Sequence, residues 1–153
     1  MPMNSLDLNR TMDVNKTFQI IVNYCKAQDI LLTEQQSLVL KIICCHDEAV
    51  AAHKILESLK VINAKANRMT IHRALEYLNK IGVVHKISFN NTYVPCTHLN
   101  EHNCQLLVCI KCGKKIEFSS AEIFASLKQS GEEHEFFIST PIEIMGYCKE
   151  CLT

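Results

Sequence analysis

The segment NRMTIHRALEYLNKIGVVHKISFNNTYVPC, residues 67–96, decides the fold of the N-terminal half of this chain. Asn67 is a favourable N-cap, and Gly82 can end the helix that follows it. The strand-like runs VVHKISF and TYVPC then flank Asn90-Asn91, a pair that tolerates the positive φ of a tight turn. The segment therefore predicts a helix and a two-stranded hairpin. The buried stripe of this helix is expected to consist of Ile71, Ala74, Leu75 and Leu78.

Three more helical patterns precede this segment, at residues 18–25, at 34–45 after a Thr33 N-cap, and at 49–59. Helices followed by such a hairpin describe a winged helix-turn-helix, which we expect over residues 15–96 after a polar N-terminal arm at 1–14. Beyond Pro95 short strand-like runs (CQLLVCI, KKIEFS, HEFFIS, PIEIMGY) surround one helix near 120–129. Residues 97–153 are thus expected to form a small α/β domain, and the whole chain is of the α+β class.

Two Cys-x-x-Cys pairs bracket most of this second domain, and 35 residues separate them. Each pair can bind one zinc ion through both sulfurs, so the two pairs together predict a tetrahedral site of four thiolates. Four sulfur ligands leave no position for water, which makes the site structural. Buried cysteines or a redox dithiol are the alternatives, but a redox pair would have to open a helix after a strand. The predicted ligands are Cys109, Cys112, Cys148 and Cys151.

The composition is that of a folded soluble protein, with 48% hydrophobic and 21% charged residues in 153. No apolar run approaches the roughly 18 residues that span a bilayer, and the polar start does not resemble a secretory signal. We therefore expect a cytoplasmic protein without a membrane partner. In that reducing compartment the nine cysteines favour metal ligation over disulfides.

Charge is unevenly distributed although Lys plus Arg (16) equals Asp plus Glu (16). Before Cys96 there are 11 basic and 8 acidic residues, and from Cys96 onward 5 basic and 8 acidic residues. Between Lys60 and Lys86 six basic residues accompany a single acid, Glu76. A solvated helix face is the simplest explanation, but the excess coincides with the helix that a winged-helix protein uses to read DNA.

These motifs together resemble the ferric uptake regulator family, and within it the zinc uptake regulators. The resemblance rests on LTEQQSLVL (32–40), TIHRALEYLNKIGVVHKI (70–87), TYVPC (92–96) and the two cysteine pairs. Gln36 stands where the family usually has arginine, and His72 where it usually has tyrosine. The resemblance implies a transcriptional repressor of zinc uptake and homeostasis genes, for which zinc is the co-repressor.

The resemblance also implies a second, regulatory zinc site, and hence two zinc ions per subunit. His85 and Cys96 belong to the DNA-binding domain, whereas His102 and Glu117 belong to the domain that the family uses for dimerisation. One ion bound by all four would lock the dimer in a DNA-binding conformation. A thiolate in such a set favours zinc over ferrous or manganous ions. From the sequence alone, His98 or Cys104 can substitute for one of these ligands.

For DNA, the resemblance implies a homodimer that binds a palindromic double-stranded operator. Bidentate pairing of Arg73 with guanine is expected in the major groove. The residues implied in base reading are Arg68, Thr70, His72 and Arg73, and those implied in phosphate contacts are Lys60, Lys65 and Lys86.

Three alternatives remain open at this level. The chain can be a family member that senses iron or another metal, or a winged-helix and zinc-ribbon transcription module that senses nothing. It can also be a metalloenzyme in which His85, Cys96 and His102 hold a catalytic zinc and Glu117 is a base. Because no Ser/His/Asp or glycine-rich phosphate motif is present, we expect no enzymatic activity.

Overall fold

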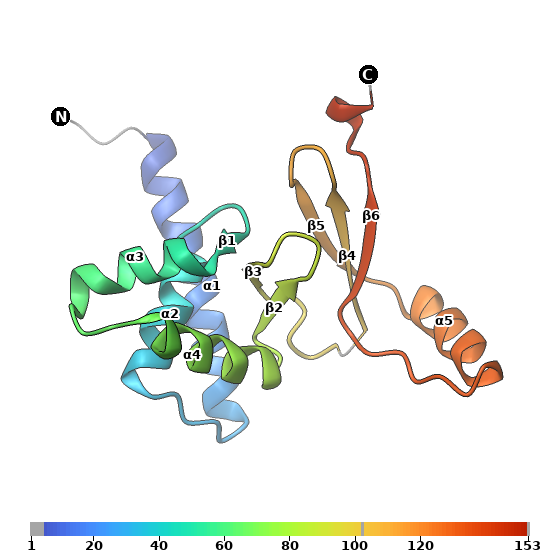
Figure 1. Cartoon of the computed structure of the whole chain (residues 1–153), viewed down its shortest axis with the longest axis horizontal. Helices are drawn as coiled ribbons and strands as arrows, with labels where there is room; N and C mark the ends of the chain where they lie inside the picture. The colour runs from blue at the N-terminus through green and yellow to red at the C-terminus, as the bar shows by residue number, and fades with distance from the viewer. Residues whose placement is uncertain (1–4, 102, 153) are drawn as a thin grey trace. The chain divides into compact units, whose positions relative to one another are not determined.

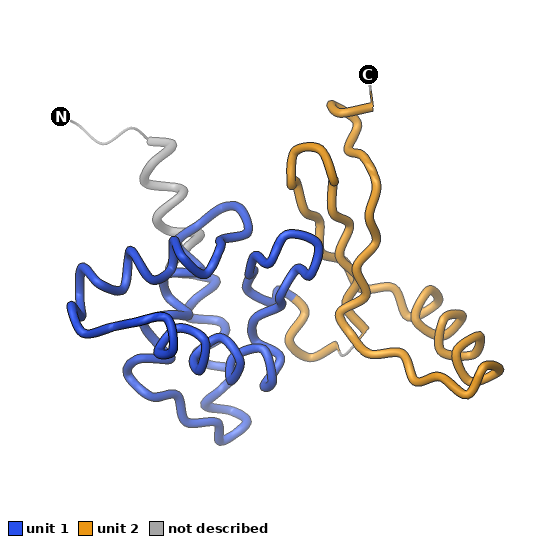
Figure 2. Tube along the Cα trace, in the orientation of Figure 1, with its two compact units in different colours: residues 1–97 blue, residues 98–153 orange. Residues whose placement is uncertain are grey.

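The computed structural model describes residues 5–101 and 103–152, and for residues 5–15 it describes the backbone only. The chain divides into two compact units, Met1–Thr97 and His98–Thr153 (Figure 2). The first unit contains helices and a winged hairpin, and the second is a small sheet with one long helix. The predicted fold class is confirmed. Among the described residues no helix is both long and apolar enough to cross a membrane.

The described residues of unit 1 form four helices, α1 (Ser5–Ala27), α2 (Glu34–Cys44), α3 (Ala52–Ile62) and α4 (Arg68–Lys80) (Figure 1). The sequence predicts a polar arm over residues 1–14, but helix α1 begins at Ser5, so most of that segment is helical. The other three helices lie close to their predicted positions. The apolar residues Val39, Leu40, Ile43, Ile55, Leu59, Ile71, Leu75 and Leu78 are all buried where α2, α3 and α4 pack together.

Helix α4 starts as the sequence predicts. The side chain of Asn67 accepts a hydrogen bond from the Thr70 N–H (3.1 Å), and the Thr70 hydroxyl accepts one from the Asn67 N–H (3.2 Å). This reciprocal capping box satisfies backbone donors that a helix start otherwise leaves unpaired. It fixes the direction in which the exposed face of α4 points.

The wing is a three-stranded antiparallel sheet in the order β1 (Val50–Ala51), β3 (Thr92–Pro95) and β2 (Val84–Ile87). Asn91 has φ of +53° in the predicted tight turn between β2 and β3. The sequence placed the start of α3 at Ala49, which is wrong by three residues. Val50 and Ala51 instead pair with Tyr93 and Thr92, some forty residues away, and form a short third strand.

Unit 2 is a sheet in the order β5 (Lys115–Ser119), β4 (Cys104–Cys109) and β6 (Ile142–Gly146), in which β4 is antiparallel to β5 and parallel to β6. Helix α5 (Ala121–Glu133) connects β5 to β6, and a short 3₁₀ helix, η1 (Lys149–Cys151), follows. The fully buried Gln105 on β4 anchors the start of α5, because its Oε1 accepts from the Ser120 N–H (2.7 Å) and its Nε2 donates to the Ser120 carbonyl (3.3 Å).

The expected strand HEFFIS (134–139) does not form. Its first residues end α5 instead: the Phe136 N–H donates to the Gly131 carbonyl (2.8 Å), and Glu135 has φ of +55°. This is a helix-terminating turn, and it takes those residues out of any strand. Phe137 is left 91% exposed.

Candidate metal centres and DNA-binding surface

The first cysteine pair lies in a tight turn at the end of β4. The Cys109 N–H donates to the Lys114 carbonyl (2.8 Å), and the Gly113 N–H donates to the Cys109 carbonyl (2.9 Å). Gly113 has φ of +79°, a conformation that strains any residue with a side chain. The Lys114 N–H also donates to the sulfur of Cys112 (3.5 Å).

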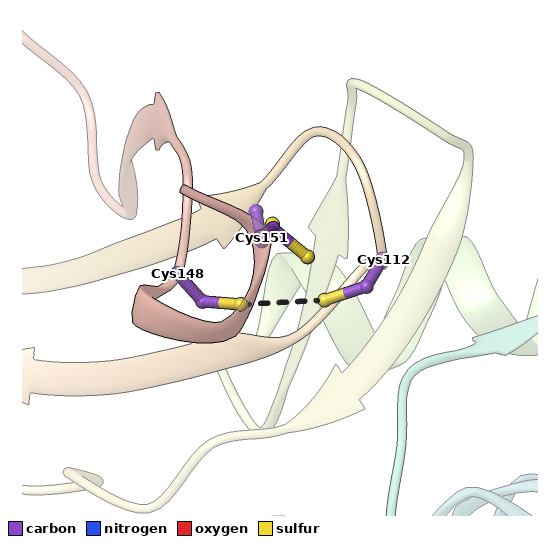
Figure 3. A group of neighbouring side chains, drawn as sticks. Cys112, Cys148 and Cys151 are labelled. Carbon is purple, nitrogen blue, oxygen red and sulfur yellow. Dashed lines mark hydrogen bonds between the residues drawn. The ribbon is translucent and has the colours of Figure 1, made fainter. Parts of the chain in front are cut away.

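The second pair, Cys148 and Cys151, lies around η1, where the Cys151 N–H donates to the Cys148 carbonyl (2.9 Å). The four cysteine sulfurs all lie within 4.8 Å of one another, and those of Cys112 and Cys148 are 3.7 Å apart (Figure 3). Zinc binds thiolates at about 2.3 Å, so tetrahedral coordination separates the sulfurs by about 3.8 Å. The predicted four-cysteine group therefore fits a zinc ion, and its four sulfur donors complete a tetrahedral site without any other ligand.

Hydrogen bonds within this group shift the pKa values of its thiols in opposite directions. Backbone N–H groups of Cys148 and Cys112 lower the pKa of the Cys109 thiol to about 6. A hydrogen bond with the Cys148 thiol raises the pKa of Cys151 to about 12. Cys109 is therefore more readily ionised than Cys151 at neutral pH. Because zinc binds thiolates, protons compete with it, and its affinity for such a group falls as the pH falls.

Unit 1 contributes two of the four residues predicted for the regulatory site. His85 on β2 is 6% exposed, and Cys96, which follows β3, is 3% exposed. The Cys96 N–H donates to the Val83 carbonyl (2.9 Å), which continues the β2–β3 pairing by one step. Since alternate residues of a strand share a face, Cys96 lies on the face of His85. A ring nitrogen of His85 and the sulfur of Cys96 are within 4.8 Å of each other.

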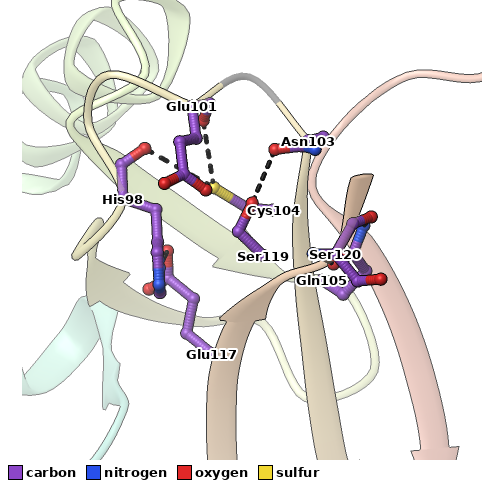
Figure 4. A network of polar contacts seen from close by, with 8 residues as sticks. All are labelled: His98, Glu101, Asn103, Cys104, Gln105, Glu117, Ser119 and Ser120. Atoms are coloured by element: carbon purple, nitrogen blue, oxygen red, sulfur yellow. Dashed lines mark hydrogen bonds and ion pairs between the residues drawn. The ribbon is translucent and has the colours of Figure 1, made fainter. Parts of the chain in front are cut away.

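Unit 2 contributes Glu117 on β5, whose side chain is only 4% exposed. The Nδ1 atom of His98 lies 3.4 Å from its Oε1 (Figure 4). Cys104 on β4 also belongs to this group, with its sulfur within 4.8 Å of a Glu117 carboxylate oxygen. His102, the fourth predicted ligand, lies outside the described residues. Candidate metal donors thus occur in each unit: a nitrogen and a sulfur on the wing of unit 1, and a carboxylate and a thiol on the sheet of unit 2.

The predicted base-reading residues lie on the exposed side of α4 or in its first turn. Arg68, His72 and Arg73 are exposed. Thr70 has a local role that the sequence did not reveal, because its hydroxyl is engaged in the capping box with Asn67. Of the predicted phosphate-binding lysines, Lys60 and Lys65 are exposed and Lys86 is half-buried on β2. The cationic groups of Arg68 and Arg73 on α4 are therefore open to solvent.

A hollow on the same unit is lined by the N-terminal residues of α2 and α4 and by Arg73. Gln36, where the family usually has arginine, takes part in a second capping box. Its Oε1 accepts from the Thr33 N–H (2.9 Å), and its own N–H donates to the Thr33 hydroxyl (3.1 Å). The glutamine at this position thus stabilises the start of α2.

Comparison with known proteins is consistent with this geometry. The chain is 28% identical over 131 residues to the zinc uptake regulation protein of Escherichia coli (strain K12), covering 84% of this chain and 77% of that protein. It is 25% identical over 112 residues to the ferric uptake regulation protein of Yersinia pestis, covering 72% and 74%. A solved zinc uptake regulator complexed with zinc and DNA superimposes with a TM-score of 0.79 at 25% identity, covering 91% of this chain and 95% of that one. Holo XcZur gives 0.77 at 25% identity, covering 90% and 97%. The profile of the ferric uptake regulator family matches residues 27–144, so the chain belongs to that family of metal-responsive, DNA-binding transcription regulators and is most similar to its zinc uptake regulators.

Proposed function

We propose that the protein is a zinc-responsive repressor of zinc uptake and homeostasis genes. The observation that carries the proposal is the division of the regulatory ligands: His85 and Cys96 lie together on the wing, and the buried Glu117 lies on the sheet of the other unit. A similar zinc uptake regulator has been solved with zinc and DNA bound. We extend the binding of both zinc and DNA from that protein to this chain.

In this proposal His85, Cys96, His102 and Glu117 hold one ion, which supplies a positive charge that all four donors share. The wing carries the first two, and the sheet carries the last. Each unit alone offers only part of the ligand set. Zinc binding therefore favours the arrangement of the units in which all four donors reach the ion. A differential stabilisation of about 1–3 kcal/mol is enough to change DNA affinity by about 5- to 150-fold. The other ion, in the four-cysteine group, would be structural, giving two per subunit.

A homodimer is part of the proposal, in keeping with the dimers that this family forms. One face of the unit 2 sheet exposes an in-register apolar row, Leu107 (38%), Ile116 (51%) and Ile144 (37%). Helix α5 beside it has only one buried residue, Gly131, among those described. Burying such apolar surface against a second copy is favourable at about 25 cal/mol per Å². Two copies related by a two-fold axis present two α4 helices, which suits a palindromic operator.

Selection from a random library of double-stranded DNA tests the function as a whole. With zinc present, we expect the protein to enrich one palindromic sequence, and with a chelator we expect no enrichment. Equal enrichment in both conditions would instead indicate the non-sensing transcription module. Enrichment that requires ferrous rather than zinc ions would indicate an iron sensor. A catalytic zinc at His85, Cys96 and His102 would predict no zinc-dependent selection.

The Arg73→Ala variant tests the base-reading face of α4. Loss of one bidentate arginine–guanine contact costs about 1–3 kcal/mol, so Kd for the selected palindrome should rise by about 5- to 150-fold. Kd for scrambled DNA should change far less. Lys80→Ala is the matched control, since Lys80 is an equally exposed cation in the last turn of the same helix. Fluorescence anisotropy measures Kd for the unmodified protein and both variants on each of the two DNAs. An equal loss of affinity for the two DNAs would indicate that Arg73 contacts a phosphate rather than a base.

A further inference from the structure

Glu76 is an acidic residue in the middle of the exposed side of α4. A buried stripe fixes which residues of that helix point to solvent, and it consists of Ile71, Ala74, Leu75 and Leu78. Met69, Arg73 and Glu76 are spaced four and three residues apart, so they follow one another along the opposite side. All three are exposed. Glu76 therefore lies on the same strip of the helix as Arg73, the residue expected to pair with guanine.

The charge of Glu76 differs from that of the residues around it. It is the one acid between Lys60 and Lys86, a stretch with six basic residues. Arg73 lies three residues before it and Lys80 four residues after it, spacings at which helical ion pairs form. Among the described residues, however, Glu76 makes no hydrogen bond or ion pair. A carboxylate in this position is repelled by DNA phosphates, and a hydrogen-bond donor on a base can offset that repulsion.

The chemistry of a carboxylate restricts which base it can contact. An ionised carboxylate accepts hydrogen bonds and donates none. In the major groove cytosine presents a donor, its N4 amino group, whereas guanine presents two acceptors and thymine presents an acceptor and a methyl group. Adenine has an amino donor, but the N7 acceptor beside it repels a carboxylate. Cytosine is therefore the favoured partner of an exposed glutamate on a helix in the major groove.

We propose that Glu76 is a specificity-determining residue, whose carboxylate accepts a hydrogen bond from the N4 amino group of an operator cytosine. This inference rests on the proposed function, because it requires α4 to read bases in the major groove. Three residues of an α-helix rise by about 4.5 Å, and successive base pairs are about 3.4 Å apart. The cytosine is therefore expected in the base pair next to the one whose guanine Arg73 contacts.

Selection from a random DNA library with three proteins tests this assignment. In zinc, the unmodified protein should fix a cytosine at that position of each half-site. Glu76→Ala should lose the preference at that position and keep the others. Glu76→Gln should move the preference toward adenine, because a glutamine amide pairs with both N6 and N7 of that base. Alanine and glutamine are good helix formers and Glu76 is exposed, so both variants should fold.

Affinity measurements separate base reading from simple repulsion. Replacing the cytosine with 2-pyrimidinone removes only its 4-amino group. For the unmodified protein Kd should then rise by about 10- to 150-fold, the value of one hydrogen bond to a charged group. For Glu76→Ala the same replacement should leave Kd unchanged. This variant should also bind scrambled DNA more tightly than the unmodified protein does, because one negative charge near the phosphates is gone.

Glu57→Ala is the matched control, since Glu57 is an exposed acid on α3 of the same unit. It should keep every base preference and remain as sensitive to 2-pyrimidinone as the unmodified protein.

Tighter binding of Glu76→Ala to the palindrome and to scrambled DNA by the same factor, with every base preference kept, would overturn the assignment. Glu76 would then be a surface charge that only repels phosphates. The unmodified protein would still select its palindrome in zinc, so the proposed function would stand. An unmodified protein that selected no sequence in zinc would instead refute the proposed function. The two failures are therefore distinguishable.

Discussion

Replacing Cys112 with serine is expected to remove zinc from the four-cysteine group and to unfold unit 2. A serine hydroxyl does not ionise near neutral pH, so the group would retain only three thiolates. Structural zinc sites in small domains contribute about 10–16 kcal/mol of apparent binding free energy, which is as large as the roughly 5–15 kcal/mol that stabilises a typical domain. Unit 2 has few other sources of stability, since its sheet face and α5 are largely exposed.

Zinc content, far-ultraviolet circular dichroism and sedimentation velocity measure this effect together. The variant should lose sheet signal, sediment as a monomer and contain no tightly held zinc. Cys45→Ser replaces an exposed thiol outside the group and should behave as the unmodified protein. An intact dimer with no metal in the Cys112→Ser variant would refute the structural role of this group.

Replacing Cys96 with serine should leave the protein folded, unlike the Cys112→Ser variant. It should abolish the response of DNA binding to zinc. Serine is close to cysteine in size, and the backbone N–H of residue 96 still donates to the Val83 carbonyl. The regulatory set loses a thiolate, so one zinc per chain should remain where there were two. Kd for the palindrome in zinc should rise by about 5- to 150-fold, the whole of the expected coupling.

The Glu117→Gln variant makes the same test at a predicted ligand in unit 2. If one ion joins the units, loss of the carboxylate from β5 and loss of the thiolate beside β3 should give the same DNA-binding defect. Both variants should keep the weak, zinc-independent binding that is expected at low salt, because their basic residues are unchanged. A Cys96→Ser variant that responds to zinc with an unaltered midpoint would exclude Cys96 as a regulatory ligand.

Local signals made most of unit 1 predictable. The Asn67 cap and the apolar spacing of α4 act within a few residues of the chain, and both are present in the structure. The Asn90-Asn91 turn is equally local, since Asn91 alone must adopt a positive φ. The two cysteine pairs could be recognised because zinc fixes their spacing within each turn, and all four sulfurs do converge.

What the sequence did not predict depends on pairing or packing over longer distances. Val50 and Ala51 continue a helical pattern, and only their pairing with β3 makes them a strand. Phe136 and Phe137 have the composition of a strand, but the residues before them are needed to end α5. Thr70 was assigned to DNA from its position alone, whereas its hydroxyl also caps the helix.

Cys104 shows the same limit within unit 2. In the sequence it is a small apolar residue next to a strand, a pattern that a core cysteine also gives. Only the register of β4 and β5 shows that it lies diagonal to Glu117. His98 is similar: its contact with Glu117 joins residues that are 19 positions apart. Potential metal-binding side chains could be identified from the sequence, but the residues that contact them in the folded chain could not.

The central claim is that one zinc ion, held jointly by the wing and by the unit 2 sheet, controls binding to DNA. It is tested most directly by counting zinc per chain before and after mild chelation, with a gel shift on the selected palindrome run on the same samples. We expect two ions per chain to fall to one, with the gel shift lost at that step and restored when zinc is returned. A shift that persists after the second ion has gone, or a single ion per chain throughout, would contradict it.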